Sequence, residues 1–209
     1  MHTHDSDVQA YWEGHYGERD RVWSGRVNVQ LASIVRDLTP GRALDLGCGE
    51  GGDAVWLAER GWHVMAVDVS ETALQRAAGE AQARGVLDRI EFQQHDLSDS
   101  FPDGEFDLVS AQFLHSTVRL ERPAILRRAA RAVVPGGLLV IVDHAAPPPG
   151  AAKVLQDHPF PGADEVLAEL DLPSLEWDRV RVETVDREAT DREGRSFTVR
   201  DNVMVHRRR

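Results

Sequence analysis

Hydrophobic and polar positions recur with two different periods through the middle of the chain. Short apolar runs, typical of buried strands, are separated by stretches whose apolar residues recur every three or four positions, as on one face of a helix. Strands are expected at residues 42–46, 63–69, 89–94, 106–111 and 137–143, and helices at 27–38, 52–60, 71–84 and 119–133. Strands that alternate with helices form right-handed βαβ units, so the pattern predicts a buried parallel sheet.

The pattern changes after residue 143. Residues 144–162 are rich in proline and cannot form a central strand, and a short helix is expected at 163–170. Residues 177–188 and 196–207 then alternate polar and apolar positions around the segment ATDREGR, which predicts a β-hairpin. The expected fold is therefore an α/β fold in which a parallel sheet is followed by an antiparallel hairpin.

The first 25 residues show no regular period, and we expect them to be irregular. They contain four of the seven Trp and Tyr residues of the chain, namely Tyr11, Trp12, Tyr16 and Trp23. A concentration of aromatic side chains in an irregular segment has two readings. The rings pack on the edge of the sheet, or they form a lid over a bound ligand.

Composition narrows the class of protein. The 209 residues suit one α/β domain spanning 1–209. No apolar run reaches the length of a membrane span and no signal peptide is evident, so we expect a cytoplasmic protein without a membrane partner. The net charge of −11 argues against a nucleic-acid partner. Cys48, the single cysteine, cannot form an internal disulfide, and no metal site is expected from the Cys and His spacing.

The segment ALDLGCGEGGD, residues 43–53, carries a glycine loop between a strand and a helix. Gly47, Gly49 and Gly52 satisfy the dinucleotide pattern G-x-G-x-x-G, and Gly47 and Gly49 would let a ligand approach the backbone closely. Asp68 ends the second strand, where a carboxylate accepts hydrogen bonds from ribose hydroxyls. These residues predict an adenosine-containing ligand without deciding which one.

Three further features favour a ligand other than a dinucleotide. Asp45 lies under the loop, where a carboxylate would repel a pyrophosphate but attract an ammonium or sulfonium group. Asp96 follows the third strand and can accept from an adenine amine, with the Leu97 amide beside it. The sequence Val-Pro-Gly-Gly then comes before the fifth strand.

Residues 40–143 resemble the class I S-adenosylmethionine-dependent methyltransferases in the order and spacing of the motifs ALDLGCGEGGD, HDL, FDLVSAQFLH and VPGG. The resemblance implies a Rossmann-like, mostly parallel sheet of seven strands with helices on both faces and a C-terminal antiparallel hairpin. It also implies S-adenosylmethionine as cofactor, with Asp45, Gly47, Gly49 and Gln112 around its methionine part. Asp68 and Val69 would lie at the ribose, and Asp96 and Leu97 at the adenine.

The tail of the chain resembles that of the tellurite-resistance methyltransferases and, more distantly, the thiopurine methyltransferases, which act on small molecules. One departure concerns the hairpin turn, which is flanked by basic residues in the tellurite-type proteins. Here the corresponding positions hold Glu188, Ala189 and Ser196, which puts an oxyanion substrate in doubt.

In this reading Tyr11, Tyr16 and Trp23 cover the cofactor and present π-surface to its sulfonium, while Arg26 pairs with its carboxylate. Residues 144–162 would shape the substrate side of the site, since long loops often cover active sites.

Catalytic groups are expected at the ends of the fourth and fifth strands, where the candidates are His115, Asp143 and His144. The reaction predicted is an in-line methyl transfer to a sulfur, nitrogen or oxygen atom of a small molecule, by a monomer or homodimer. Two alternatives stay open. One is an NAD-dependent oxidoreductase, and the other is a protein that binds S-adenosylmethionine without catalysis.

Overall fold

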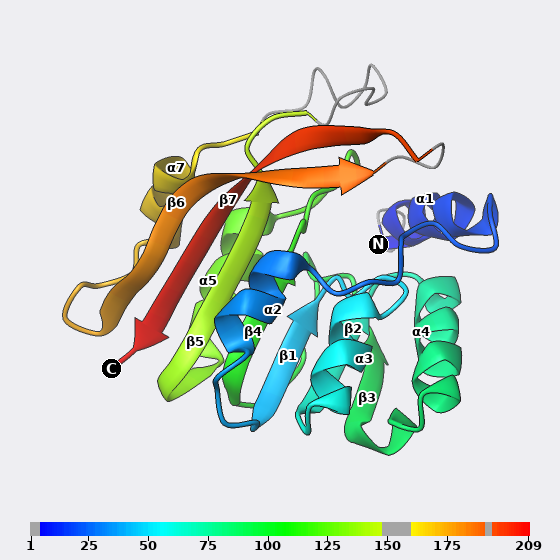
Figure 1. The fold of residues 1–209 in the computed structure, drawn as a ribbon, viewed down its shortest axis with the longest axis horizontal. Coiled ribbons are helices and arrows are strands. Elements are labelled where there is room, and N and C mark those ends of the chain that lie inside the picture. Colours follow the sequence, from blue (N-terminus) through cyan, green and yellow to red (C-terminus); the bar gives the residue numbers. More distant parts are fainter. Residues whose placement is uncertain (1–4, 148–159, 191–193) are drawn as a thin grey trace.

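The computed structural model describes residues 5–147, 160–190 and 194–209. One sheet contains seven strands in the order β3-β2-β1-β4-β5-β7-β6 (Figure 1). They are β1 (Arg42–Leu46), β2 (His63–Asp68), β3 (Ile90–Gln94), β4 (Phe106–Gln112), β5 (Val133–His144), β6 (Trp177–Thr190) and β7 (Ser196–Arg208). The first five strands pair in parallel, and β7 is antiparallel to both β5 and β6. The expected α/β sheet with its C-terminal hairpin is confirmed.

Helices cover both faces of this sheet because its central strands are apolar on both sides. On one face lie α2 (Val29–Val35), α3 (Gly52–Glu59) and α4 (Glu71–Ala83), followed by a short 3₁₀ turn at Leu87–Arg89. On the other face lie α5 (Arg122–Arg131) and α7 (Ala163–Leu170) (Figure 1). Neighbouring residues of β1 show the alternation, since Ala43 packs in the core cluster under α2 and α3, and Leu44 packs in the core cluster under α5 and α7.

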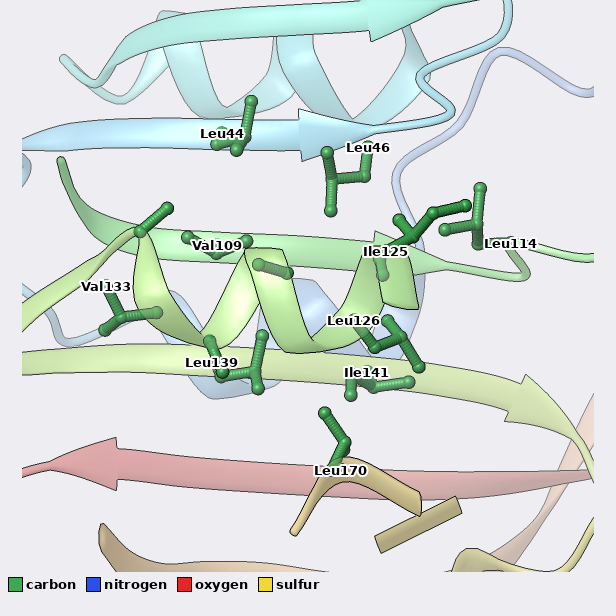
Figure 2. Packing of buried hydrophobic residues seen from close by; sticks show 14 of the residues in the cluster. Leu44, Leu46, Val109, Leu114, Ile125, Leu126, Val133, Leu139, Ile141 and Leu170 are labelled. Atoms are coloured by element: carbon green, nitrogen blue, oxygen red, sulfur yellow. The ribbon is translucent and has the colours of Figure 1, made fainter. Parts of the chain in front are cut away.

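Figure 2 shows the core beneath α5, where Leu126 of α5 lies close to Ile141 of β5. Ile125, Leu126, Leu139 and Ile141 are all essentially inaccessible to solvent. Leu170 at the end of α7 closes the same cluster near β7. Burial on this scale fixes the strand register, which in turn sets the positions of the polar residues at the strand ends.

The expectation of an irregular N-terminus is wrong, because residues Asp5–Gly17 form helix α1, which lies beside α4 (Figure 1). Contacts with α4 hold it there rather than an apolar stripe of its own. The Glu13 carboxylate accepts from the amide and hydroxyl of Thr72, at 3.3 and 2.5 Å. Arg76 donates to the Tyr16 carbonyl at 3.0 Å. Such long-range contacts leave no periodic signal in the sequence.

The fifth strand also begins earlier than expected, at Val133 instead of residue 137. Pro135 and Gly136 therefore lie inside the strand, where the pairing with β4 shifts register between Phe106 and Leu108. Gly136 has a φ of +84°. A proline and a glycine are tolerated here because the ladder is interrupted at this point.

The position of Ile141 predicts a large effect of truncation. Replacing Ile141, which has 0% exposure, with alanine removes buried methyl groups between β5 and α5. We expect Ile141→Ala to lower the free energy of unfolding by about 2–5 kcal/mol in a urea titration. Leu175→Ala is the control, because Leu175 is 85% exposed and should change this free energy by less than about 0.5 kcal/mol. Equal effects of the two variants would contradict the assigned core.

Candidate functional site

The candidate site lies at the carboxyl ends of β1 to β5, around the point where the strand order reverses between β1 and β4. After β1 the chain turns through the glycine loop into α3. Gly47 and Gly49 have φ angles of +69° and +53°, which favour glycine. A Cβ atom on Gly47 would lie 2.7 Å from Leu114, and one on Gly49 would lie 3.0 Å from the Tyr16 hydroxyl. The loop therefore needs glycine at both positions.

Asp68, at the end of β2, is buried against this loop. Its carboxylate accepts from the Gly49 amide at 2.9 Å and from the Ser70 amide at 3.0 Å. Ser70 in turn caps α4 by accepting from the Ala73 amide at 3.1 Å. Burial raises the pKa of Asp68, although these hydrogen bonds oppose the shift. The Asp68 carboxylate is thus fixed at the end of β2, beside the glycine loop.

Besides one oxygen of Asp143, three buried oxygen atoms at the site have no hydrogen-bond partner within the described part of the chain. They belong to Asp45 near the end of β1, Asp96 after β3 and Gln112 at the end of β4. The unpartnered Asp96 oxygen does lie 3.5 Å from a guanidinium nitrogen of Arg119, as an ion pair. Buried acceptors without donors are costly. Their placement suits a ligand that brings N–H groups or positive charge to the strand ends.

Asp45 has only 2% exposure, and burial, followed by repulsion from Asp53 and Asp68, raises its pKa well above the ordinary value. Burial likewise raises the pKa of Asp53 to about 6. A cationic ligand group beside Asp45 would favour its ionised form. The site therefore fits a ligand with an ammonium or sulfonium group.

The segment after α1 lies directly on the glycine loop. The Trp23 indole donates to the Tyr16 hydroxyl at 3.0 Å, and both side chains lie against Gly49. Glu50, a loop residue with 3% exposure, holds this segment in place. Its carboxylate accepts from the amides of Val22 and Trp23, at 3.1 and 2.8 Å, and pairs with Arg76 at 2.9 Å. The sequence analysis missed Glu50 because its role depends on a segment 27 residues away.

The other predicted cofactor residues to be placed are Tyr11, Arg26, Val69 and Leu97. The Tyr11 hydroxyl lies 2.7 Å from that of Thr117, in the connection after β4. The Arg26 backbone lies against Gly52, and its guanidinium has no ion pair among the described residues. Val69 and Leu97 lie beside Asp68 and Asp96, and their carbonyls accept from the side chains of Gln94 and Arg128, at 3.0 and 3.4 Å.

The three catalytic candidates come together beyond β4 and β5. Asp143 has 0% exposure and forms an ion pair with Arg122. The Nε2 atom of His115 lies 3.5 Å from the other oxygen of Asp143. Burial raises the pKa of Asp143, and the Arg122 guanidinium opposes that shift. The rings of His115 and His144 are nearly parallel, with centroids 6.4 Å apart.

His144 has its own carboxylate partner, which the sequence analysis missed. Its Nδ1 lies 3.2 Å from Asp201 of β7, and Asp201 also accepts from Arg187 of β6 at 2.6 Å. Phe113 stacks on the His144 ring, with centroids 4.2 Å apart. Two histidine–carboxylate–arginine groups therefore lie side by side at the end of the sheet.

Other candidate chemistry finds no support at this site. Burial raises the pKa of the Cys48 thiol well above its ordinary value, so this thiol is not poised as a nucleophile. Over residues 5–147, 160–190 and 194–209, no group of three or more His, Cys, Asp or Glu side chains could hold a metal ion. Within the same ranges no helix is both long enough and apolar enough to cross a membrane.

The sheet order is that of the α/β nucleotide-binding folds, and the candidate site lies at its switch point. Residues 43–137 match the family model of a methyltransferase domain. The chain is 34% identical over 154 residues to the 2-heptyl-1-hydroxyquinolin-4(1H)-one methyltransferase of Mycobacteroides abscessus. That match covers 71% of this chain and 65% of the relative, so the chain spans slightly less than two thirds of the relative's length.

Two solved structures share the fold. TehB from Haemophilus influenzae is 18% identical with a TM-score of 0.69, covering 94% of this chain and 67% of TehB. The magnesium protoporphyrin IX methyltransferase ChlM from Synechocystis PCC 6803, with bound SAH, is 19% identical with a TM-score of 0.68. That similarity covers 97% of this chain and 98% of ChlM. Residues 43–137 are thus similar to a methyltransferase domain, and S-adenosylmethionine is the cofactor that this similarity indicates.

The contacts of Glu50 predict how the N-terminal segment is released. Burial opposes ionisation of Glu50, but hydrogen bonds from Trp23, Arg76 and Val22 hold its pKa below the ordinary value of 4.5. Docking of the N-terminal segment on the glycine loop is therefore strongest above pH 4.5, and it weakens as the pH falls through the pKa of Glu50 in the folded protein. Glu50→Gln should lower the hydrogen-exchange protection of the Val22 and Trp23 amides about tenfold at pH 7.

The matched control for this experiment is Glu59→Gln. Glu59 pairs with Arg84 at 3.2 Å on the surface and does not touch the N-terminal segment. Its substitution should leave the protection of both amides unchanged. Unchanged protection in Glu50→Gln as well would show that this carboxylate does not hold the segment.

Proposed function

We propose that this protein transfers the methyl group of S-adenosylmethionine to a small-molecule acceptor by in-line displacement. The observation that carries the proposal is the set of buried oxygens of Asp45, Asp96 and Gln112 that accept no hydrogen bond from the described residues, at the strand ends beside the glycine loop. S-adenosylmethionine offers a cationic sulfonium, an ammonium and an adenine amine in one molecule, and these groups match the three acceptors in charge and kind. When bound, it supplies a methyl group on a good leaving group, so alignment and exclusion of water are the main tasks of the protein.

Each candidate cofactor residue has a role in this proposal. Asp45 and Gln112 accept from the ammonium group, and the Gly47 and Gly49 backbone gives the methionine part room to approach. Asp68 accepts from the ribose hydroxyls, with the Val69 backbone beside it. Asp96 accepts from the adenine amine, and the Leu97 amide donates to the ring. Arg26, which has no ion pair among the described residues, is the partner assigned to the cofactor carboxylate.

The acceptor is proposed to lie beyond β4 and β5, next to His115, Asp143 and His144. A small molecule suits this position, in line with the relative from Mycobacteroides abscessus, whose named acceptor is a hydroxyquinolinone. We further propose a single domain over 1–209, cytoplasmic and monomeric or homodimeric, without a nucleic-acid partner. Residues 1–25 would serve as a lid and 144–162 as a substrate-side loop, most of which lies outside the described residues.

Calorimetric titration tests the cofactor. S-adenosylmethionine should bind the protein with a dissociation constant on the order of micromolar, and NAD should not bind. Asp68→Ala should weaken binding about 100-fold, because two hydrogen bonds to a charged acceptor are lost. The control is Asp164→Asn, a carboxylate 89% exposed on α7, which should bind normally. Binding of NAD, or of neither ligand, would overturn the proposal.

A truncation tests the lid. Deleting residues 1–24 removes Tyr16 and Trp23 from Gly49, so water reaches the loop, while both core clusters stay intact. We expect methyl transfer from radiolabelled S-adenosylmethionine, assayed on thiols, phenols and heterocyclic amines, to disappear although the truncated protein still unfolds cooperatively. A deletion of residues 1–4 is the control and should keep full activity. Normal turnover without residues 1–24 would show that the segment is not a lid.

A further inference from the structure

The register of the last strands brings His144 and Asp201 together. Residues 144 and 201 are direct partners in the antiparallel pairing of β5 with β7, and the Nδ1–Oδ1 distance is 3.2 Å. Side chains directly opposite each other on paired strands are close enough to interact. Arg187 of β6 lies diagonally across from Asp201, two residues beyond Val185, the direct partner of Asp201.

Asp201 is built to accept hydrogen bonds and not to donate them. It has 0% exposure, and Arg187 donates to its second oxygen at 2.6 Å. Burial alone would raise the pKa of Asp201, but the hydrogen bonds from His144 and Arg187 hold it below the ordinary value. An ionised carboxylate has no proton to give. In the neutral form of the His144 ring, the Nδ1 atom must therefore carry the hydrogen, which leaves the lone pair on Nε2.

The Nε2 atom of His144 makes no hydrogen bond to another described residue. The Phe113 ring stacks on the His144 ring, with centroids 4.2 Å apart, and the His144 side chain is 23% exposed. The other charged or titratable groups around it belong to the neighbouring set, namely His115, Arg122 and Asp143. In that set the Nε2 atom of His115 is directed at Asp143, so His115 does not present the same free acceptor.

We propose that Asp201 is a positioning residue that fixes His144 as the general base, and that the methyl acceptor is an aromatic or heteroaromatic hydroxyl group. This inference rests on the proposed methyl transfer. The acceptor oxygen forms the O–CH₃ bond, the S–CH₃ bond breaks with its electron pair left on sulfur, and the hydroxyl proton goes to Nε2 of His144. The imidazolium then loses this proton to water.

The chemistry of the acceptor explains why a fixed base belongs here. A thiol is partly ionised near neutral pH, and a tertiary amine has no proton to lose, so neither needs a base for methylation. A phenolic hydroxyl with a pKa near 10 is mostly neutral and gains from one. Phe113 and His115 have rings next to His144, and the Phe160 ring lies against His115, so aromatic surface for an acceptor gathers here.

The kinetic experiment uses the full-length protein, S-adenosylmethionine, and a series of probes comprising 4-methoxyphenol, phenol, 4-nitrophenol and thiophenol. With 4-methoxyphenol, His144→Gln and Asp201→Asn should lower kcat by about 10²–10⁴-fold with little change in KM. With 4-nitrophenol, which ionises by itself near neutral pH, the loss should fall below about tenfold. Asp186→Asn is the control, an exposed carboxylate on the same hairpin that pairs with Arg200.

Two kinetic outcomes would overturn the inference. One is a wild-type enzyme that methylates only thiophenol among these probes. The other is an equal loss of kcat for phenols of every acidity in the two variants, because a structural defect does not depend on the acidity of the acceptor. If S-adenosylmethionine fails to bind the wild-type protein, the proposed function itself fails, and that result is separate from both outcomes.

A second measurement needs no acceptor. In the ¹⁵N spectrum of histidine-labelled protein with S-adenosylmethionine present, the His144 signal, assigned by its loss in His144→Gln, should show the neutral ring protonated on Nδ1. Asp201→Asn should shift this signal toward the Nε2-protonated tautomer, since an amide can donate to Nδ1. Asp186→Asn should leave it unchanged. A His144 ring protonated on Nε2 in the wild-type protein would overturn the inference.

Discussion

The carboxylate of Asp68 accepts one hydrogen bond from the glycine loop, through Gly49, and another from Ser70 at the start of α4. This single group ties β2 to the loop after β1 and to the helix on which α1 lies. The geometry of the glycine loop, and through it the placement of Tyr16 and Trp23 against Gly49, depend on this carboxylate. A buried carboxylate is expensive unless it is satisfied, and here the satisfaction comes from backbone amides that define the cofactor end of the site.

The two ends of the site use carboxylates differently. At the proposed cofactor end Asp45 is buried with other acids nearby, so a positively charged ligand would stabilise its ionised form. At the proposed acceptor end Asp143 and Asp201 each have an arginine, so their charge is already balanced within the protein. One arrangement attracts a cation and the other orients histidine rings. The two environments are separated in the sheet because Asp45 lies on β1, whereas Asp143 and Asp201 lie on β5 and β7.

Much of this architecture could be predicted from the sequence, since the strands, the glycine loop and Asp68 depend on local pattern and spacing. The exceptions have one physical origin. Helix α1 is held by contacts with Thr72 and Arg76. The Glu50 carboxylate accepts a hydrogen bond from the Trp23 amide, and the register of β5 with β7 places Asp201 opposite His144. Each depends on residues far apart in the chain, whose pairing is decided by packing. The early start of β5 at Val133 likewise reflects a register shift that no propensity encodes.

Glu50 and Gly49 are neighbours, and the first holds the N-terminal segment while the second lies under Tyr16 and Trp23. Docking of the segment and occupation of the site are therefore two equilibria that meet at adjacent peptide units. Thermodynamic linkage makes such coupling reciprocal, so any free energy that docking adds to ligand binding is returned as stabilisation of docking. The rate at which a protease cuts near residue 20 then becomes a gauge of how fully the site is filled, readable even for a ligand that undergoes no reaction.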